Sequence, residues 1–141
     1  MKIRPFLIAV LAFIGMVDAL YLSLKRNAGP VPCHVTRGCT DVLTSKYSEI
    51  AGVPLSWIGT AFYVTVFSLS VVALLGESGD VASAGRLIFY LSGAGLIISG
   101  LLVGIQAFIL KAFCEYCLLS AALVLTMFLL APHPARHKLP E

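Results

Sequence analysis

Charged residues are scarce in this chain of 141 residues. Asp, Glu, Lys and Arg make up 12% of it, against about 25% in typical soluble domains. Apolar residues account for 59%, and the mean hydropathy is +0.95. This composition excludes an ordinary soluble domain and predicts an integral membrane protein.

A strong excess of either charge is also missing. The net charge is only +3 and is spread over short loops, so nothing indicates a nucleic-acid partner. The positive-inside rule gives no orientation either, because basic residues are equally divided between the two predicted sides: Lys2, Arg4, Arg86, Arg136 and Lys138 on one, and Lys25, Arg26, Arg37, Lys46 and Lys111 on the other.

Four apolar runs are long enough to cross a bilayer, namely residues 6–24, 55–75, 87–110 and 113–131. The first follows Lys2 and Arg4 as in a signal peptide. It is longer than the apolar core of a signal peptide and no Ala-x-Ala cleavage site follows, so we expect a retained helix. The chain is therefore predicted to be an all-α integral membrane protein, a single domain over residues 1–141 built as a four-transmembrane-helix bundle.

The connections between these runs differ in length and content. Residues 25–54 form the longest polar loop, in which Asp41 to Ile50 are predicted to form a short amphipathic helix lying over the bundle as a lid. Residues 76–85 are predicted to be a short turn at the opposite face, without visible function.

The four cysteines form two pairs, Cys33 with Cys39 in the long loop and Cys114 with Cys117 at the start of the last run. Four helices joined in this order place both pairs at one membrane face. Two such pairs indicate disulfide chemistry, which persists outside the cytoplasm. We therefore expect the cysteines on the periplasmic or extracellular face of the plasma (inner) membrane and both termini in the cytoplasm.

Cys117 is predicted to lie in the first turns of the last helix. The uninterrupted run from Leu118 to Ala131 would be about 21 Å long, too short for about 30 Å of hydrocarbon, so the helix must begin near Phe113. A thiol at that boundary can meet a lipid-soluble reagent. Unpaired N–H groups and the helix dipole favour a thiolate there, whereas Glu115 opposes it.

Other readings of the cysteines remain open. A CxxC combined with a five-residue spacing is a poor tetrahedral framework, so no metal site is predicted. A purely structural loop disulfide between Cys33 and Cys39 would close without strain, since Gly38 permits a tight return. The chain could also be a thiol-based carrier of soft metal ions, or a structural membrane subunit with inert disulfides.

Two polar residues in the apolar runs are candidate site residues. Asp18 is the only acid in the first run, and burying a carboxylate there is costly. It is either a proton carrier opposite Gln106 or a protonated or hydrogen-bonded residue that fixes helix packing. Ser56, near the cysteine face, could donate a hydrogen bond to a ligand carbonyl or act as a helix cap.

Three features together resemble those of bacterial homologues of vitamin K epoxide reductase, in the short form without a fused thioredoxin-like domain. They are the loop pair Cys33 and Cys39, the segment Gly52 to Ser56 that enters the second helix, and Cys114-Glu115-Tyr116-Cys117 opening the fourth.

The resemblance implies a four-helix bundle around a quinone, either ubiquinone or menaquinone. Electrons would pass from a reduced periplasmic thioredoxin-like (DsbA-like) protein to the loop pair, then to the CxxC pair and the quinone. It further implies that Cys33 exchanges with the partner, Cys39 attacks Cys114, and Cys117 meets the quinone. Ser56 matches the family's serine at the start of the second helix.

The chain also departs from the animal enzymes of this family. Leu55 stands where they have an asparagine, and Ala121 stands where they have a tyrosine. Both differences favour plain quinone reduction over epoxide reduction. A related alternative, the DsbB type, carries its CxxC in the first periplasmic loop, whereas here the motif opens the last helix.

Overall fold

The computed structural model describes residues 3–26, 49–50, 53–111 and 115–131. In this part of the chain the helices are α1 (Ile3–Arg26), α3 (Leu55–Leu75), α4 (Ser78–Ile105) and α5 (Glu115–Leu130). Two short strands, β1 (Glu49–Ile50) and β2 (Val53–Pro54), precede α3. The architecture is a helical bundle, as the composition predicts.

Three of these helices are long and apolar enough to cross a membrane: Ile3–Leu24, Leu55–Leu75 and Gly79–Ile109. The described helix α5 is also apolar but has only 16 residues. Helices are the natural outcome for such runs, because lipid offers no hydrogen-bond partner and each backbone group must be paired within the segment. The protein is thus a helical membrane protein.

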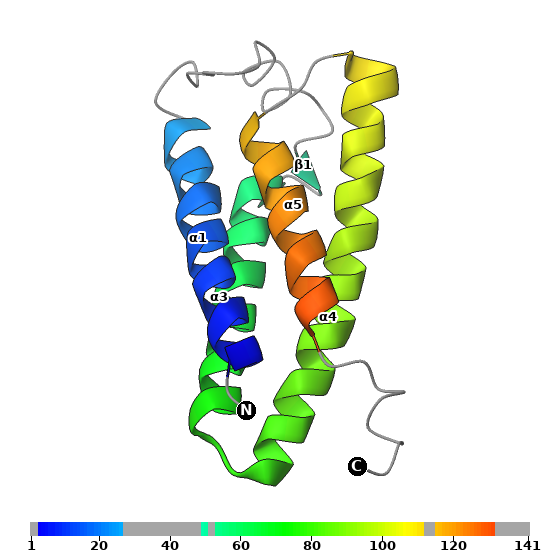
Figure 1. Cartoon of the computed structure of the whole chain (residues 1–141). Coiled ribbons are helices and arrows are strands. Elements are labelled where there is room, and N and C mark those ends of the chain that lie inside the picture. Colours follow the sequence, from blue (N-terminus) through cyan, green and yellow to red (C-terminus); the bar gives the residue numbers. More distant parts are fainter. Residues whose placement is uncertain (1–2, 27–48, 51–52, 112–114, 132–141) are drawn as a thin grey trace.

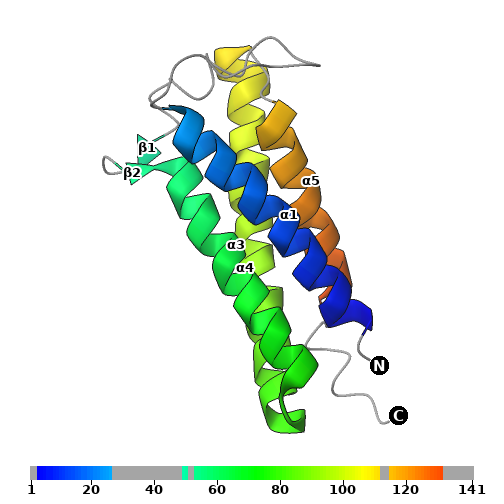
Figure 2. The same cartoon turned by 90° about the vertical axis from the view of Figure 1, so that its left-hand side faces the viewer.

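Successive helices run in opposite directions along the bundle (Figure 1). Each packs against two neighbours, α1 against α3 and α5, and α4 against α3 and α5, with the most extensive contact between α1 and α3 (Figure 2). Helix α1 ends at Arg26, and α3 and α5 begin at Leu55 and Glu115, all at the same end of the bundle. We call this the Cys117 end. The turn between α3 and α4 lies at the other end, here called the Gly76 end.

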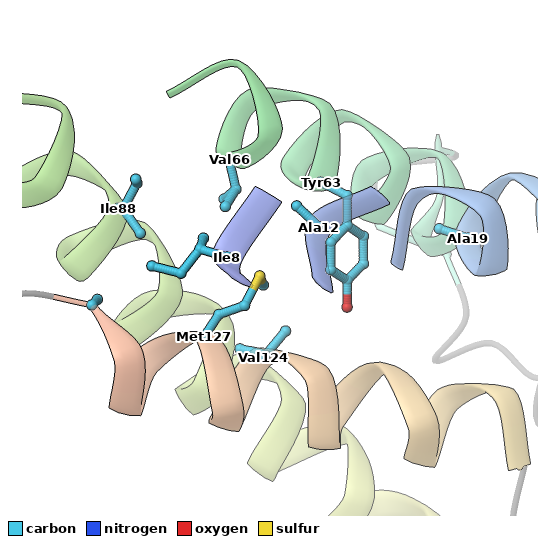
Figure 3. Packing of buried hydrophobic residues seen from close by; sticks show 9 residues of the cluster. Ile8, Ala12, Ala19, Tyr63, Val66, Ile88, Val124 and Met127 are labelled. Carbon is cyan, nitrogen blue, oxygen red and sulfur yellow. The ribbon is translucent and has the colours of Figure 1, made fainter. Parts of the chain in front are cut away.

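A small apolar core runs along the bundle axis (Figure 3). It is made of Ile8, Ala12, Ala19, Tyr63, Val66, Ile88, Val124, Met127 and Ala131. Large apolar side chains also cover the outside, among them Phe6, Phe13, Val17, Val72, Leu87, Ile97, Leu101, Phe108 and Leu129. An apolar exterior of this extent suits contact with lipid rather than water.

Helix α3 has the bounds that the sequence predicts, but α4 begins at Ser78, nine residues before the predicted Leu87. The predicted turn over residues 76–85 is therefore wrong, because only Gly76 and Glu77 separate the two helices. In these extra turns Ala84 is buried, at 2% exposed. Gly76 makes the short connection possible, since a Cβ there would lie 2.6 Å from the Val72 carbonyl oxygen.

The long polar loop is described only at its end. Glu49 and Ile50, predicted to close an amphipathic helix, instead form strand β1, which pairs antiparallel with β2 in the register Glu49 to Pro54 and Ile50 to Val53. The rest of that predicted helix, residues 41–48, lies outside the described residues. The strand pair lies beside the start of α3 (Figure 2).

Helix α4 changes its geometry near the Cys117 end. Residues Gln106–Leu110 form a π-helical segment, η2. The chain then leaves the helix at Lys111, which adopts a left-handed conformation (φ 53, ψ 32) and whose N–H donates to the Gln106 carbonyl. Single π-helical turns of this kind frequently occur at functional sites.

Candidate functional site

Cys117 lies in the first turn of α5, half-buried, at the Cys117 end of the bundle. The structure therefore places this thiol where the sequence predicts it, next to the backbone N–H groups of a helix start. The other three predicted cysteines, Cys33, Cys39 and Cys114, lie outside the described residues. Their pairing and order of reaction stay predictions.

An aromatic pair joins α1 to α5 beside Cys117. The rings of Tyr21 and Tyr116 lie 5.5 Å apart between centroids, inclined at 47°. Tilted contacts of this kind are favourable beyond the area that they bury. Because Tyr116 precedes Cys117 directly in the chain, the contact fixes the start of α5 against α1.

Tyr63 connects three helices one turn deeper in the bundle. Its side chain extends from α3 toward α5 (Figure 3), and is 1% exposed. Its hydroxyl oxygen lies 2.6 Å from the hydroxyl oxygen of Ser120 on α5, and it also donates to the Ser120 carbonyl at 3.2 Å. On the α1 side the ring lies against Gly15, where a Cβ would overlap the ring carbons.

Asp18 lies in α1 at the same depth, three residues after Gly15. It is 8% exposed, and its Oδ2 atom is buried without a hydrogen-bond partner in the described part of the chain. It shares a face of α1 with Gly15, which lies against the Tyr63 ring, because residues three apart lie on one side of a helix.

Gln106, the predicted counterpart of Asp18, is also buried, at 3% exposed. It begins the π-helical segment η2 on α4. Since Asp18 Oδ2 has no hydrogen-bond partner among the described residues, Gln106 does not bond to that oxygen.

Ser56 lies in the first turn of α3, half-buried, at the Cys117 end. Its carbonyl accepts a hydrogen bond of 2.9 Å from the Thr60 hydroxyl. Beside it Trp57 is 43% exposed, as suits an aromatic residue at a membrane interface. The predicted ligand contact of Ser56 stays a prediction.

Tyr63 and Ser120 are the residues that sequence reasoning missed. Each lies inside an apolar run, where hydropathy hides a single hydroxyl group. The available signal was chemical, because a tyrosine buried among apolar side chains usually finds a partner for its hydroxyl. Which partner it finds depends on how α3 and α5 are packed.

Comparisons with known proteins agree on one family. The sequence profile described as the vitamin K epoxide reductase family matches residues 6–131. The chain is also 38% identical over 124 residues to the thiol-disulfide oxidoreductase LTO1 of Arabidopsis thaliana. That alignment covers 82% of this chain but 32% of the plant protein, so the chain spans about a third of that relative's length.

Proposed function

Because the chain belongs to the vitamin K epoxide reductase family, we propose that it is a membrane thiol-disulfide oxidoreductase that passes electrons from a thioredoxin-like protein to a membrane quinone. The observation that carries this proposal is the position of Cys117, half-buried in the first turn of an apolar helix. The name of the plant relative, a thiol-disulfide oxidoreductase, supports the same chemistry.

The proposed relay uses all four cysteines. A reduced DsbA-like protein gives two electrons to the Cys33–Cys39 disulfide and leaves as a disulfide itself. The loop dithiol then reduces the Cys114–Cys117 disulfide, and the CxxC dithiol reduces the quinone to a hydroquinone. The first two steps each exchange one dithiol for one disulfide, and the last converts one dithiol and one quinone into one disulfide and one hydroquinone. Two electrons and two protons therefore travel together, and no other reductant is needed.

A strong final acceptor is required by the energetics. A DsbA-type disulfide has a potential near about −120 mV, and about 30 mV corresponds to 1.4 kcal/mol for two electrons. Such a partner is difficult to reoxidise unless the acceptor is more oxidising still. A quinone meets this requirement and dissolves in the layer that Cys117 borders.

The described residues at the Cys117 end suit a quinone substrate. A quinone needs apolar surface for its ring and hydrogen-bond donors for its carbonyl oxygens. Ser56 is half-buried in the first turn of α3, and Trp57 beside it offers an exposed aromatic face. We propose Ser56 as a hydrogen-bond donor to a quinone carbonyl.

The proposed orientation places the Cys117 end outside the plasma membrane and both termini in the cytoplasm. Disulfide exchange with a secreted partner needs the cysteines in an oxidising compartment. The start of α1 and the end of α5 lie at the Gly76 end (Figure 1), which supports a common side for the two termini.

The test is quinone reduction by the purified protein, supplied either with a reduced thioredoxin-like protein or with a small dithiol. We expect Cys117→Ala to abolish turnover with both donors. Cys33→Ala should abolish turnover with the protein donor but retain it with the small dithiol, because only the entry step needs that thiol. Ser70→Ala is the control, since this buried hydroxyl bonds to Val66 in its own helix.

Two results would contradict the proposal. Full turnover by Cys117→Ala would exclude this thiol from the electron path. No quinone reduction by the wild-type protein with any donor, together with stoichiometric binding of a soft metal ion, would favour a metal carrier instead.

A further inference from the structure

We propose that Tyr63 is a positioning residue for the Cys117 thiol. Its hydroxyl group bonds to Ser120 and thereby holds the first two turns of α5 at one height and one rotation in the bundle. The inference rests on the proposed function, because its consequence is the rate at which the CxxC dithiol reduces a quinone. It requires no contact between Tyr63 and the thiol or the quinone.

Helix α5 needs such a bond because its own sequence gives it little direction. It is about 24 Å long, shorter than about 30 Å of hydrocarbon. From Leu118 to Leu130 its polar residues are Ser120 and Thr126, and the exposed Thr126 hydroxyl donates to Ala122 in the same helix. In lipid, helices are held together by close packing and by hydrogen bonds between them. Ser120 is therefore the residue of this stretch whose side chain ties α5 to another helix.

The bond between Tyr63 and Ser120 is directional. The two hydroxyl oxygens lie 2.6 Å apart, and the Tyr63 hydroxyl also donates to the Ser120 carbonyl oxygen at 3.2 Å. Other buried hydroxyl groups, those of Ser23, Ser70 and Ser92, donate to carbonyl groups of their own helices. Tyr63 instead contacts both the side chain and the backbone of a residue in another helix, which restricts the sliding and the rotation of α5 together.

Tyr63 can act in this way because its own ring is held in place. The side chain is buried, and its ring meets the Phe62 ring edge-on, with 5.2 Å between centroids. The ring also lies against Gly15 of α1, where a Cβ would overlap it. Helices α1 and α3 share the most extensive contact in the bundle. The hydroxyl group therefore fixes α5 relative to the best-packed pair of helices.

The position of Ser120 is passed to Cys117 through the backbone of α5. The two residues are three apart, a rise of about 4.5 Å, and the hydrogen bonds along the helix join the turns that contain them. Tyr116, which precedes Cys117, contacts the ring of Tyr21 on α1 at 5.5 Å between centroids. Cys117 thus lies between two contacts of α5, one with α1 and one with α3.

A fixed thiol matters because the last step of the relay depends on distance. As the Cys114–Cys117 S–S bond forms, the dithiol gives two electrons and two protons to the quinone, which becomes a hydroquinone. Reacting atoms must come within about 3–3.5 Å, and a displacement of about 1 Å can slow a reaction on the order of 100-fold. Tyr63 supplies neither electrons nor protons, and its part is to keep Cys117 within this range.

The experiment compares Tyr63→Phe, Ser120→Ala, Ser120→Thr and a double variant that combines the first two, in the full-length protein. Phenylalanine keeps the ring against Gly15, and threonine keeps a hydroxyl group at position 120. Protein reduced beforehand is mixed with increasing concentrations of a short-chain ubiquinone analogue. Single-turnover rates then give the maximal rate and the half-saturating quinone concentration separately. Disulfide exchange with the thioredoxin-like donor is measured without quinone.

We expect Tyr63→Phe to lower the maximal rate on the order of 100-fold, with the half-saturating concentration and the exchange with the donor unchanged. Ser120→Ala should cause a smaller loss, because the Ser120 carbonyl still accepts from Tyr63. Ser120→Thr should keep a rate near that of the wild type. The double variant should be no slower than Tyr63→Phe, since both changes break the same bond.

Two variants control for the loss of a hydroxyl group as such. Tyr90→Phe makes the same exchange at an exposed tyrosine of α4. Ser92→Ala removes a buried hydroxyl group that bonds to Ile88 in its own helix. Both variants should reduce quinone as fast as the wild type.

Four outcomes would overturn the inference. A wild-type maximal rate in Tyr63→Phe would show that the bond does not position the thiol, while the proposed function stands. A raised half-saturating concentration with an unchanged maximal rate would place Tyr63 in quinone binding. Equal losses in quinone reduction and in disulfide exchange, with a lowered melting temperature, would assign the bond to stability only. A wild-type protein that reduces no quinone would remove the proposed function and this inference together.

Discussion

Tyr63 combines two tasks that usually fall to different residues. Its ring fills the space beside Gly15 in α1, and its hydroxyl bonds to Ser120 in α5. In a small bundle such a residue sets both the distance between α1 and α3 and the position of α5 along the bundle axis. A change in packing at Gly15 is therefore expected to shift Ser120, which lies one helical turn after Cys117.

The substitution Gly15→Ala tests whether packing at Gly15 affects the position of α5. The added methyl group would overlap the Tyr63 ring, so the ring or the helices must move. We expect a loss of about 1–3 kcal/mol in the free energy of unfolding, as for other overpacked interiors, together with slower quinone reduction. Thermal unfolding in detergent measures the first effect.

Gly100→Ala is the matched control for Gly15→Ala. Outside its own helical turn, no atom of the described chain lies within 4 Å of a Cβ at Gly100, which is exposed in the last part of α4. The same exchange should there raise stability by about 1 kcal/mol, because alanine is the better helix former. An equal effect at both glycines would show that the contact with Tyr63 does not limit the packing.

At the level of single elements, α4 is the helix that differs most from its apolar run. Hydropathy marks its membrane-spanning part, whereas its first turns carry mostly small and polar residues. Ala84 in these turns is buried. At its other end the helix widens into η2 and stops at Lys111. That stop determines where the chain turns back toward α5.

Lys111 has the one positive φ of a non-glycine residue in the described chain. A left-handed conformation costs roughly 1–2 kcal/mol for a residue with a Cβ. We therefore expect Lys111→Gly to be more stable than Lys111→Ala by about 1 kcal/mol, measured by thermal unfolding of the two variants. Both remove the lysine side chain, so their difference isolates the backbone.

Ala82→Gly is the control for this comparison, because it exchanges alanine and glycine at a regular helical position of α4. Ala82 is exposed in a regular part of α4, where glycine should cost about 1 kcal/mol relative to alanine. If glycine were also worse than alanine at position 111, the left-handed stop of η2 would be contradicted.

At the scale of the whole molecule, alternating helix directions place two exposed residues at opposite ends, Glu77 at the Gly76 end and Lys111 at the Cys117 end. In the proposed orientation Lys111 faces outward and Glu77 faces the cytoplasm. The chain's own charge distribution does not decide this, so the orientation needs a direct measurement.

Single cysteines at these two positions provide it, in a variant whose four native cysteines are replaced by alanine. We expect a membrane-impermeant maleimide to label Lys111→Cys in intact cells and Glu77→Cys only in inverted membrane vesicles. Labelling of both positions from the same side would contradict a bundle that crosses the membrane between them. The reverse pattern would contradict the orientation of the proposed relay.

The class of this protein, the bounds of α3 and the position of Cys117 at a helix start all follow from the order of residues along the chain. In lipid the backbone of a long apolar run must pair its own N–H and C=O groups, and a helix does so. The length of the last apolar run shows that its helix begins near Cys117. The spacing of the four cysteines and the entry to α3 also predicted the family, which the comparisons confirm.

The start of α4, the strand at Glu49 and Ile50, and the bond between Tyr63 and Ser120 depend instead on how the helices pack in three dimensions. The hydrogen bond between Tyr63 and Ser120 joins residues 57 positions apart, and no local pattern encodes such a distance. Asp18 could be recognised as unusual from its apolar surroundings. That the Tyr63 ring packs against the same helix follows only from the close approach of α1 and α3 at Gly15, where the absence of a side chain lets the ring enter.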